Sequence, residues 1–357
     1  MDSKLQKKIQ QRIEQGTLRS LPSYDGMIDF VSNDYLGLSS LKSKFSSPGS
    51  TGSRLIAGNS DLVEQVESDL ASFFNWNSSL CFNSGYTANL SIFSSIPQKG
   101  DVVLYDQYIH ASSRDGIRLS SAQSYSFKHN DLEDLRRLLV RFSGNTIYIA
   151  IEALYSMDGD FCPLKEITKL SVRYNANIIL DEAHSCGIYG DNGKGLSNEL
   201  ELDNKIFMKL VTFGKAYGGH GACVLSEHDV KTYLINFARP FIYSTALPYS
   251  DYQFMRAIVS SKEQEVNCFK LLQNIVLFRK LVEHSLLCSD PKSPIQIIRM
   301  EQIAQLTKIA TAAQSLNIAL KVIYSPTVPA GKECIRICIH SYNTKNEINQ
   351  LANIINS

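Results

Sequence analysis

Short apolar runs alternate with helical patterns between residues 62 and 212 of the chain. The runs are rich in Ile, Leu and Val and are bounded by Gly, Asp or Ser, as is typical of strands buried in a mainly parallel sheet. Strands are expected at 79–82, 102–105, 146–154, 176–180 and 207–212, and helices at 62–74, 87–96, 131–142 and 164–174. This alternation predicts a layered α/β fold with right-handed crossovers.

The two ends of the chain depart from this pattern. Leu5, Ile9 and Ile13 recur every four residues and predict a short amphipathic helix, which a loop and a strand at 28–31 should follow. After about residue 250, a long helical stretch at 267–285 precedes a tail that we expect to be rich in helix and poor in strand.

One strand is nevertheless expected within that tail. Residues 334–340 alternate strictly, and the three isoleucines share one face, so Arg336 must point off the other face. Thr344 and Glu347 then have the spacing of a capping box that opens a last helix.

The length of 357 residues corresponds to two domains at about 150 residues each. We expect an N-terminal helix and segment (1–40), a large domain (41–262) and a smaller C-terminal domain (263–357).

Composition excludes several classes of protein. Lys and Arg number 36 and Asp and Glu 35, so the chain lacks the excess of basic residues that nucleic-acid binding requires. No apolar run approaches the ~20 residues that span a bilayer, and the first residues are too polar for a signal peptide. The eight cysteines form no CxxC pair and no zinc-finger spacing. We therefore expect reduced thiols, no metal site, and a cytoplasmic protein without nucleic-acid or membrane partners.

An acid and an imidazole follow one of the predicted strands. Asp181 stands at the carboxyl end of strand 176–180, and His184 comes three residues later. Ligands of open α/β sheets bind beyond these strand ends, where a carboxylate shielded from water acts strongly on a nearby charge. The alternative is that Asp181 only caps the turn that follows.

A single lysine among small residues follows another predicted strand. Lys215 comes after strand 207–212, between Gly214 and Ala216, so a ligand can approach its amine closely. Desolvation lowers the pKa of a lysine and makes it a nucleophile for Schiff-base formation. Taken alone, an exposed loop lysine also fits this position.

Two further positions complete the set. Gly85 and Tyr86 open the helix predicted near 87–96, where free backbone N–H groups form a cradle for an anion, although an ordinary turn is the alternative. His110 follows strand 102–105, and its flat ring could lie on another flat ring, whereas a lone histidine is more often structural. A lysine for a Schiff base, an acid for a pyridinium nitrogen and a helix start for a phosphate are the groups that pyridoxal phosphate (PLP) requires.

Six motifs resemble those of the α-oxoamine synthase family of fold-type I PLP enzymes, and the resemblance extends over about residues 18 to 340. They are SNDYLGL at 32–38, GSRLIAGN at 52–59, DEAHS at 181–185, TFGK at 212–215, YSTALP at 243–248 and PTVP at 326–329. The resemblance implies a mainly parallel central sheet with helices on both faces and a smaller C-terminal α+β domain. The sequence Ser53–Leu55 is more similar to the branch that makes 8-amino-7-oxononanoate than to the glycine-using branches.

The resemblance also implies roles for individual residues. Lys215 would hold the cofactor and later transfer a proton, Asp181 would pair with the pyridinium nitrogen, and His184 would hydrogen-bond the phenolic oxygen. His110 would stack on the cofactor ring and border the substrate. Further cofactor contacts would come from Gly85, Tyr86, Glu152, Ser156 and Thr212, and from Ser244 and Thr245 across a dimer interface.

For the substrates, the resemblance implies that Asn33 and Arg336 face an amino-acid carboxylate, for which the planar guanidinium fork of Arg336 is suited. Arg19 would lie near an acyl thioester, although it could equally be a surface residue beyond a basic helix.

The reaction implied is a condensation of L-alanine with a pimeloyl thioester, carried on coenzyme A or acyl carrier protein, by a homodimer in biotin biosynthesis. Carbon dioxide, the free thiol and 8-amino-7-oxononanoate would be the products. The alternative in the same family is a glycine-using synthase such as 2-amino-3-ketobutyrate CoA ligase. A non-enzymatic binding protein would be expected to lack Lys215, Asp181 or His184, and a nicotinamide dehydrogenase requires a GxGxxG motif that we do not find.

Overall fold

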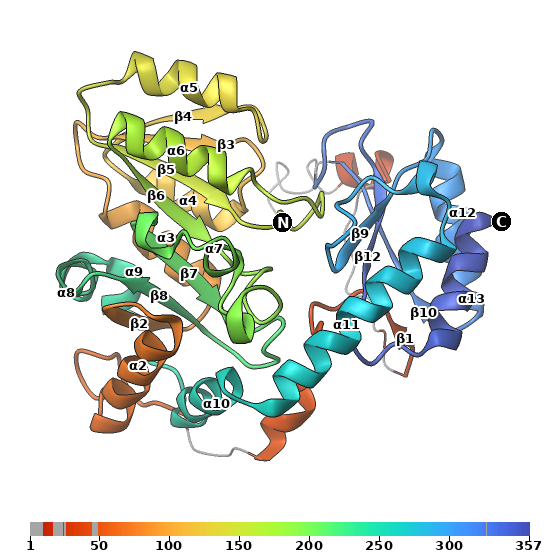
Figure 1. Ribbon diagram of the computed structural model, residues 1–357, viewed down its shortest axis with the longest axis horizontal. Coiled ribbons are helices and arrows are strands. Elements are labelled where there is room, and N and C mark those ends of the chain that lie inside the picture. Colours follow the sequence, from red (N-terminus) through yellow and green to blue (C-terminus); the bar gives the residue numbers. More distant parts are fainter. Residues whose placement is uncertain (1–9, 17–23, 25, 45–48, 326) are drawn as a thin grey trace. The chain divides into compact units, whose positions relative to one another are not determined.

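The computed structural model describes residues 10–16, 24, 26–44, 49–325 and 327–357 (Figure 1). The chain divides into two compact units, which we describe separately. The large unit comprises residues 33–156 and 160–272, and the small unit comprises 1–32, 157–159 and 273–357.

A seven-stranded sheet forms the centre of the large unit, in the order β2-β8-β7-β6-β5-β3-β4. The strands are β2 (Ser78–Phe82), β3 (Val102–Asp106), β4 (Gln123–Phe127), β5 (Ile147–Glu152), β6 (Ala176–Asp181), β7 (Met208–Thr212) and β8 (Ala222–Ser226). β8 runs antiparallel to both of its neighbours, and the other adjacent strands are parallel. The prediction of a mainly parallel sheet is confirmed, with one reversed strand.

Helices follow most of these strands. They are α2 (Asp61–Phe74), α3 (Gly85–Ser95), α4 (Ala111–Leu119), α5 (Leu132–Arg141), α6 (Leu164–Tyr174), α7 (Leu196–Glu199), α8 (His228–Phe237), α9 (Arg239–Ile242) and α10 (Tyr249–Val259), with 3-10 helices η1 (Leu38–Lys44), η2 (Asp191–Gly193) and η3 (Asp203–Lys205). α11 (Lys262–Leu281) begins in the large unit and ends in the small one. Local signals explain several boundaries: the Ser60 hydroxyl caps α2, and Asn75 ends it in the left-handed conformation.

Several elements of the large unit were not predicted from the sequence. β4 is an edge strand whose residues, apart from Phe127, are exposed or half-buried, so it lacks an apolar run. α4 carries a polar sequence with a glycine, because only part of its surface packs against the core. β8 and helices α8 to α10 follow Lys215, in a part of the chain where we had assigned no elements.

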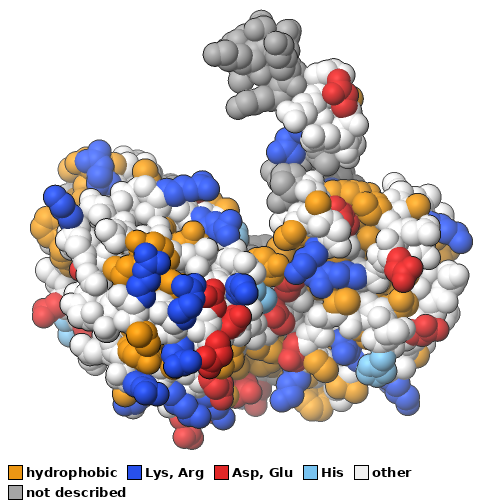
Figure 2. All heavy atoms as spheres, turned by 90° about the horizontal axis from the view of Figure 1, so that it is seen from above, with side chains coloured by type: hydrophobic (Ala, Val, Ile, Leu, Met, Phe, Trp, Pro, Cys, Tyr) orange, Lys and Arg blue, Asp and Glu red, His pale blue; other side chains and the backbone are white. Residues whose placement is uncertain are grey.

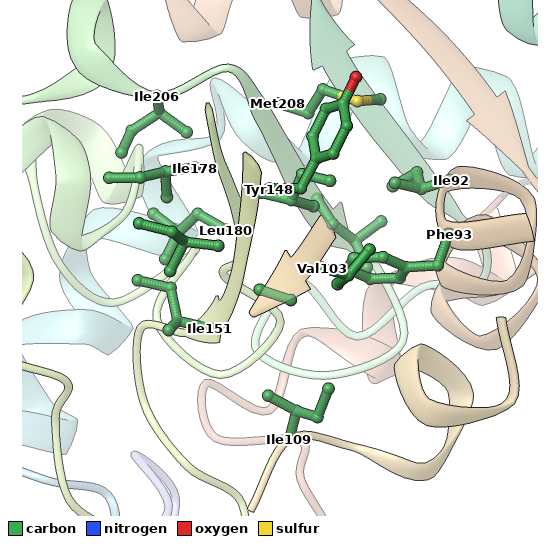
Figure 3. Packing of buried hydrophobic residues seen from close by; sticks show 14 of the residues in the cluster. Ile92, Phe93, Val103, Ile109, Tyr148, Ile151, Ile178, Leu180, Ile206 and Met208 are labelled. Carbon is green, nitrogen blue, oxygen red and sulfur yellow. The ribbon is translucent and has the colours of Figure 1, made fainter. Parts of the chain in front are cut away.

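The core of the large unit lies on both faces of this sheet. β5 is buried along its whole length, which requires cover on each side. Figure 3 shows side chains from several elements packed together in this core: Ile92 and Phe93 of α3, Val103 of β3, Tyr148 and Ile151 of β5, Ile178 and Leu180 of β6, and Met208 of β7. Full burial of such a side chain stabilises the fold by about 1.5–3 kcal/mol. The stable sheet therefore holds the residues at its strand ends in fixed positions.

The small unit contains more strand than we expected. β9 (Ile295–Ile298), β11 (Lys321–Ile323) and β12 (Cys334–Cys338) form an antiparallel sheet, and β1 (Ile28–Asp29) pairs with β10 (Ile318–Ala319). The remaining elements are the 3-10 helix η4 (His284–Leu286) and helices α12 (Ile303–Ser315) and α13 (Lys345–Asn356). The tail has more helix than strand, as expected, but β9, β10 and β11 were not predicted, because they are too short to show a clear alternation.

Other predictions for the two ends of the chain can be compared directly. β12 lies within the predicted strand 334–340, and the capping box of Thr344 and Glu347 opens α13 as predicted. Residues 10–14 are helical, and the rest of the predicted N-terminal helix lies outside the described residues.

Charged side chains of both signs are interspersed on the face shown in Figure 2, in agreement with a formal net charge of +1. Within the described ranges, none of the helices combines the length and apolar character needed to cross a bilayer.

Candidate active site

A cavity of about 210 Å³ opens in the large unit at the carboxyl ends of β5, β6 and β7. Its lining residues are Ser84, Gly85, Tyr86, Asn89, His110, Ser112, Glu152, Asp181, Ala183, His184, Thr212, Gly214, Lys215, His220 and Gly221. Most of the residues that we expected around a cofactor therefore lie around one space, although they come from distant parts of the chain.

Lys215 reaches this cavity from the turn after β7. Its Nζ atom lies 2.8 Å from Nε2 of His184. The turn is closed by a hydrogen bond from the N–H of Gly218 to the carbonyl of Lys215, at 2.8 Å. Gly218 has a φ of +65°, and a Cβ there would lie 2.2 Å from the backbone nitrogen of Ser39, so only glycine fits.

Asp181 ends β6 and is held through both carboxylate oxygens. Oδ1 accepts a hydrogen bond from the N–H of Ala183 at 2.9 Å, and Oδ2 accepts one from the side chain of Asn89 at 2.8 Å. Asp181 therefore caps the following turn, as the structural alternative proposed, and also lines the cavity. Asn89 was not predicted, although its position four residues after Gly85 places it on the same face of α3.

His184 connects Lys215 to the segment around Asn33. Its Nδ1 atom lies 2.9 Å from the hydroxyl of Tyr35, which donates a hydrogen bond to Oδ1 of Asn33 at 3.0 Å. A hydroxyl has one proton to donate, so the oxygen of Tyr35 accepts from Nδ1–H of His184. Nε2 is then left as an acceptor for the amine of Lys215.

Tyr35 is completely buried and was missed by the sequence analysis. The motif that contains it was noticed, but only Asn33 was assigned a role. No local pattern distinguishes a tyrosine that packs in the core from one that also orients a histidine 149 positions away.

His110 and Glu152 form another wall of the cavity. The backbone N–H of His110 donates to Oε1 of Glu152 at 2.5 Å, and Nδ1 of its ring lies 2.7 Å from the hydroxyl of Ser112. Burial lowers the pKa of His110 and so favours the neutral ring, although the charge of Asp181 opposes this shift. Burial, reinforced by the charge of Asp181, raises the pKa of Glu152 to about 8.

The start of α3 offers backbone donors to an anion. The side chain of Ser84 caps the N–H of Thr87 at 3.1 Å, whereas the N–H groups of Gly85 and Tyr86 precede the first intrahelical hydrogen bonds. A Cβ at Gly85 would lie 2.7 Å from Cγ2 of Thr212, so glycine allows this helix start to approach β7.

This donor set fits PLP. The helix start and Thr212 suit its phosphate, the carboxylate of Asp181 suits a protonated ring nitrogen, and the amine of Lys215 suits its aldehyde. His220 also lines the cavity. We had not predicted it, because it lies in a glycine-rich turn that resembles no motif.

Other predicted residues lie elsewhere. Ser156 does not line this cavity, and Ser244 lines a separate one of about 10 Å³. The carbonyl of Thr245 accepts a hydrogen bond from Asn83 at 2.7 Å. Arg336 belongs to β12 of the small unit, where its guanidinium contacts Sγ of Cys338 at 2.9 Å. Arg19 lies outside the described residues.

Comparisons with known proteins identify the family of the chain. Residues 25–355 match the family model for aminotransferase class I and II. An 8-amino-7-oxononanoate synthase of Emericella nidulans is 37% identical, over 95% of this chain and 90% of that protein. The crystal structure of 8-amino-7-oxononanoate synthase from Francisella tularensis superposes with a TM-score of 0.78 and 32% identity, over 93% of this chain and 97% of that one.

A second solved relative carries the cofactor. It is a serine palmitoyltransferase from S. paucimobilis with PLP and myriocin bound, with a TM-score of 0.88, 25% identity and coverage of 99% of this chain and 96% of that one. These findings confirm the fold-type I architecture and PLP as the cofactor. The chain therefore belongs to the aminotransferase class I and II family and, within it, to the α-oxoamine synthases, which are PLP-dependent acyltransferases.

Proposed function

We propose that this acyltransferase condenses L-alanine with a pimeloyl thioester in biotin biosynthesis, releasing carbon dioxide, the thiol and 8-amino-7-oxononanoate. The relative from Emericella nidulans, at 37% identity, and one from Lysinibacillus sphaericus, at 34%, carry the name of the corresponding synthase and support this choice. The observation on which the proposal rests is the amine of Lys215, which shares one cavity with Asp181 and lies 2.8 Å from Nε2 of His184.

PLP bound in this cavity would supply an electron sink for the charge that develops when the amino acid loses its α-proton. Lys215 would hold the cofactor and carry that proton. Asp181 is fixed in orientation by Asn89 and the N–H of Ala183, so it would favour a protonated ring nitrogen. The uncharged form that burial favours for the His110 ring suits stacking on the cofactor ring.

The substrate contacts follow from the resemblance. Asn33 and Arg336 would bind the alanine carboxylate, because a guanidinium fork holds a carboxylate in a fixed orientation. Arg19 would bind the acyl thioester, whose carrier is coenzyme A or acyl carrier protein.

We also propose a homodimer in which Ser244 and Thr245 contribute to the cofactor site of the partner subunit. Two large apolar side chains near them support this arrangement: Ile56 is 85% exposed and Tyr243 is 72% exposed. Thr245 forms a β-bridge with Ser53, and this bridge connects the loop that carries Tyr243 to the loop that carries Ile56. Exposed apolar surface of this kind commonly marks a protein interface.

Absorption spectra of the purified protein with PLP test the proposal. Titration with L-alanine, glycine and L-serine, each followed by pimeloyl thioester, should give a new absorbance and turnover only with alanine. Lys215→Ala should abolish turnover. Near wild-type turnover in that variant would contradict the proposed role of Lys215, and a preference for glycine would favour the glycine-using alternative.

A further inference from the structure

A second polar cluster lies beside the cavity, at the end of β3. His129 is held there between two carboxylates: Nδ1 lies 2.9 Å from Oδ1 of Asp106, and Nε2 lies 2.9 Å from Oδ2 of Asp160. Asp106 is fully buried, and the His129 side chain is 14% exposed. The proposed reaction uses none of these residues.

The two carboxylates favour a charged His129. Each ring nitrogen can bind an ionised carboxylate only by donating a proton, so contacts to Asp106 and Asp160 at the same time favour protonation of both nitrogens. The amide of Asn130, 3.3 Å from Nε2, donates to Oδ2 of Asp160 at 3.0 Å. Burial opposes this charge, but the hydrogen bonds and charges of Asp106 and Asp160 outweigh it and raise the pKa of His129 to about 10.

The Asp106 side of this cluster shapes the turn that leads to His110. Oδ1 of Asp106 also accepts the N–H of Tyr108 at 2.8 Å, and the carbonyl of Asp106 accepts the N–H of Ile109 at 3.1 Å. The ring of Tyr108 lies over that of His129, with 4.6 Å between their centres. Asp106 therefore fixes Tyr108 and Ile109, the two residues that precede His110.

The Asp160 side fixes the turn that follows β5. The carbonyl of Asp160 accepts the N–H of Tyr155 at 2.9 Å, and the Tyr155 ring meets His129 edge-on at 4.5 Å. Glu152, three residues before Tyr155, accepts the N–H of His110. The two turns are thus joined twice: at the cavity by Glu152, and behind it by His129.

We propose that His129 is a positioning residue for His110: as an imidazolium bridging Asp106 and Asp160, it fixes the turn that presents the His110 ring to the cofactor. This inference rests on the proposed function in one respect, namely that PLP binds beside the His110 ring. A ring that shifts by a fraction of an ångström stacks less well, and misplacement of about 1 Å can cost up to ~10²-fold in rate.

The test compares His129→Gln with the control His228→Gln, which changes an exposed histidine at the start of α8. NMR of selectively labelled apoprotein should show both ring nitrogens of wild-type His129 protonated at about pH 8. The ring resonances of His110 should shift in His129→Gln and stay unchanged in His228→Gln. After loading with PLP, His129→Gln should bind it roughly tenfold more weakly, with weaker visible circular dichroism per bound cofactor.

A purely structural role predicts a different outcome. His129→Gln would then melt earlier but keep the wild-type His110 resonances, PLP affinity and dichroism, and this result would overturn the proposal. An unprotonated ring nitrogen in wild-type His129 would overturn it as well. If His129→Gln does not fold, Asp160→Asn, at a carboxylate that is 32% exposed, should shift the same signals by a smaller amount. Failure of wild type to bind PLP would count against the proposed function, whereas the apoprotein spectra would still decide the role of His129.

Discussion

Replacing Tyr35 by phenylalanine removes one buried oxygen atom and leaves the ring in place. Tyr35 is completely buried, and its hydroxyl lies 2.9 Å from Nδ1 of His184 and 3.0 Å from Oδ1 of Asn33. The variant leaves Nδ1–H of His184 without this acceptor, and a buried polar group that loses its partner costs about 1–3 kcal/mol. We expect the free energy of unfolding of Tyr35→Phe to fall by that amount.

The same substitution changes what His184 presents to Lys215. In the wild type, the hydroxyl keeps the proton on Nδ1, so Nε2 can accept from the amine 2.8 Å away. Loss of a hydrogen bond worth about 1 kcal/mol shifts the ratio of the two neutral tautomers roughly fivefold. We therefore expect kcat/KM with alanine and pimeloyl thioester to fall about fivefold. The pH at which kcat/KM is highest should also change.

Tyr155→Phe is the matched control. Tyr155 is only 1% exposed, and within the described part of the chain its hydroxyl has no hydrogen-bond partner, so the change should alter neither stability nor kcat/KM appreciably. Thermal unfolding and steady-state kinetics of both variants give the comparison. Wild-type kinetics in Tyr35→Phe, or equal losses in Tyr155→Phe, would refute the assigned proton position on His184.

Three further predictions follow from other contacts. Gly85→Ala places a Cβ 2.7 Å from Cγ2 of Thr212, so it should weaken PLP binding about tenfold but pyridoxal binding much less; equal losses in titrations of the apoprotein would exclude a phosphate site at α3. Lys209→Met removes a fully buried cation 3.7 Å from Oε1 of Glu182, so it should lower the free energy of unfolding by about 3–5 kcal/mol, and an unchanged denaturation midpoint would contradict this. The pKa of His129 rises on folding to about 10, so its stabilising contribution is complete below pH ~6.5 and is lost as the pH rises towards 10; wild type should lose more thermal stability over this range than His129→Gln.

The parts of the fold that were predicted from the sequence are those with strong local signals. α6 spans Leu164–Tyr174, as expected, because an amphipathic pattern is bounded by Pro163 and by Asn175 in the left-handed conformation. β4 was missed because an edge strand needs no apolar run, and its partner β3 determines its place. β9 and β11 of the small unit are likewise defined by their pairing with β12, which the sequence does not show.

The residues of the candidate site were likewise predictable where a local sequence signal marks them. Lys215, Asp181 and Gly85 stand at element boundaries, where a chemical group next to a strand end or helix start can be recognised. Tyr35 and Asn89 contact His184 and Asp181, which lie 149 and 92 positions away in the sequence. These long-range contacts form only in the folded protein, so no local sequence pattern predicts them.

Asp181 shows why a structural and a functional interpretation of one residue need not compete. A carboxylate has two oxygens, and here one caps the turn at Ala183 while the other accepts from Asn89 on α3. The hydrogen bonds that satisfy the backbone are also those that fix the carboxylate in the cavity wall. A site that must hold a charged ring in one orientation needs such fixed groups. The capping role of Asp181 is therefore part of how the fold prepares the cavity for its cofactor.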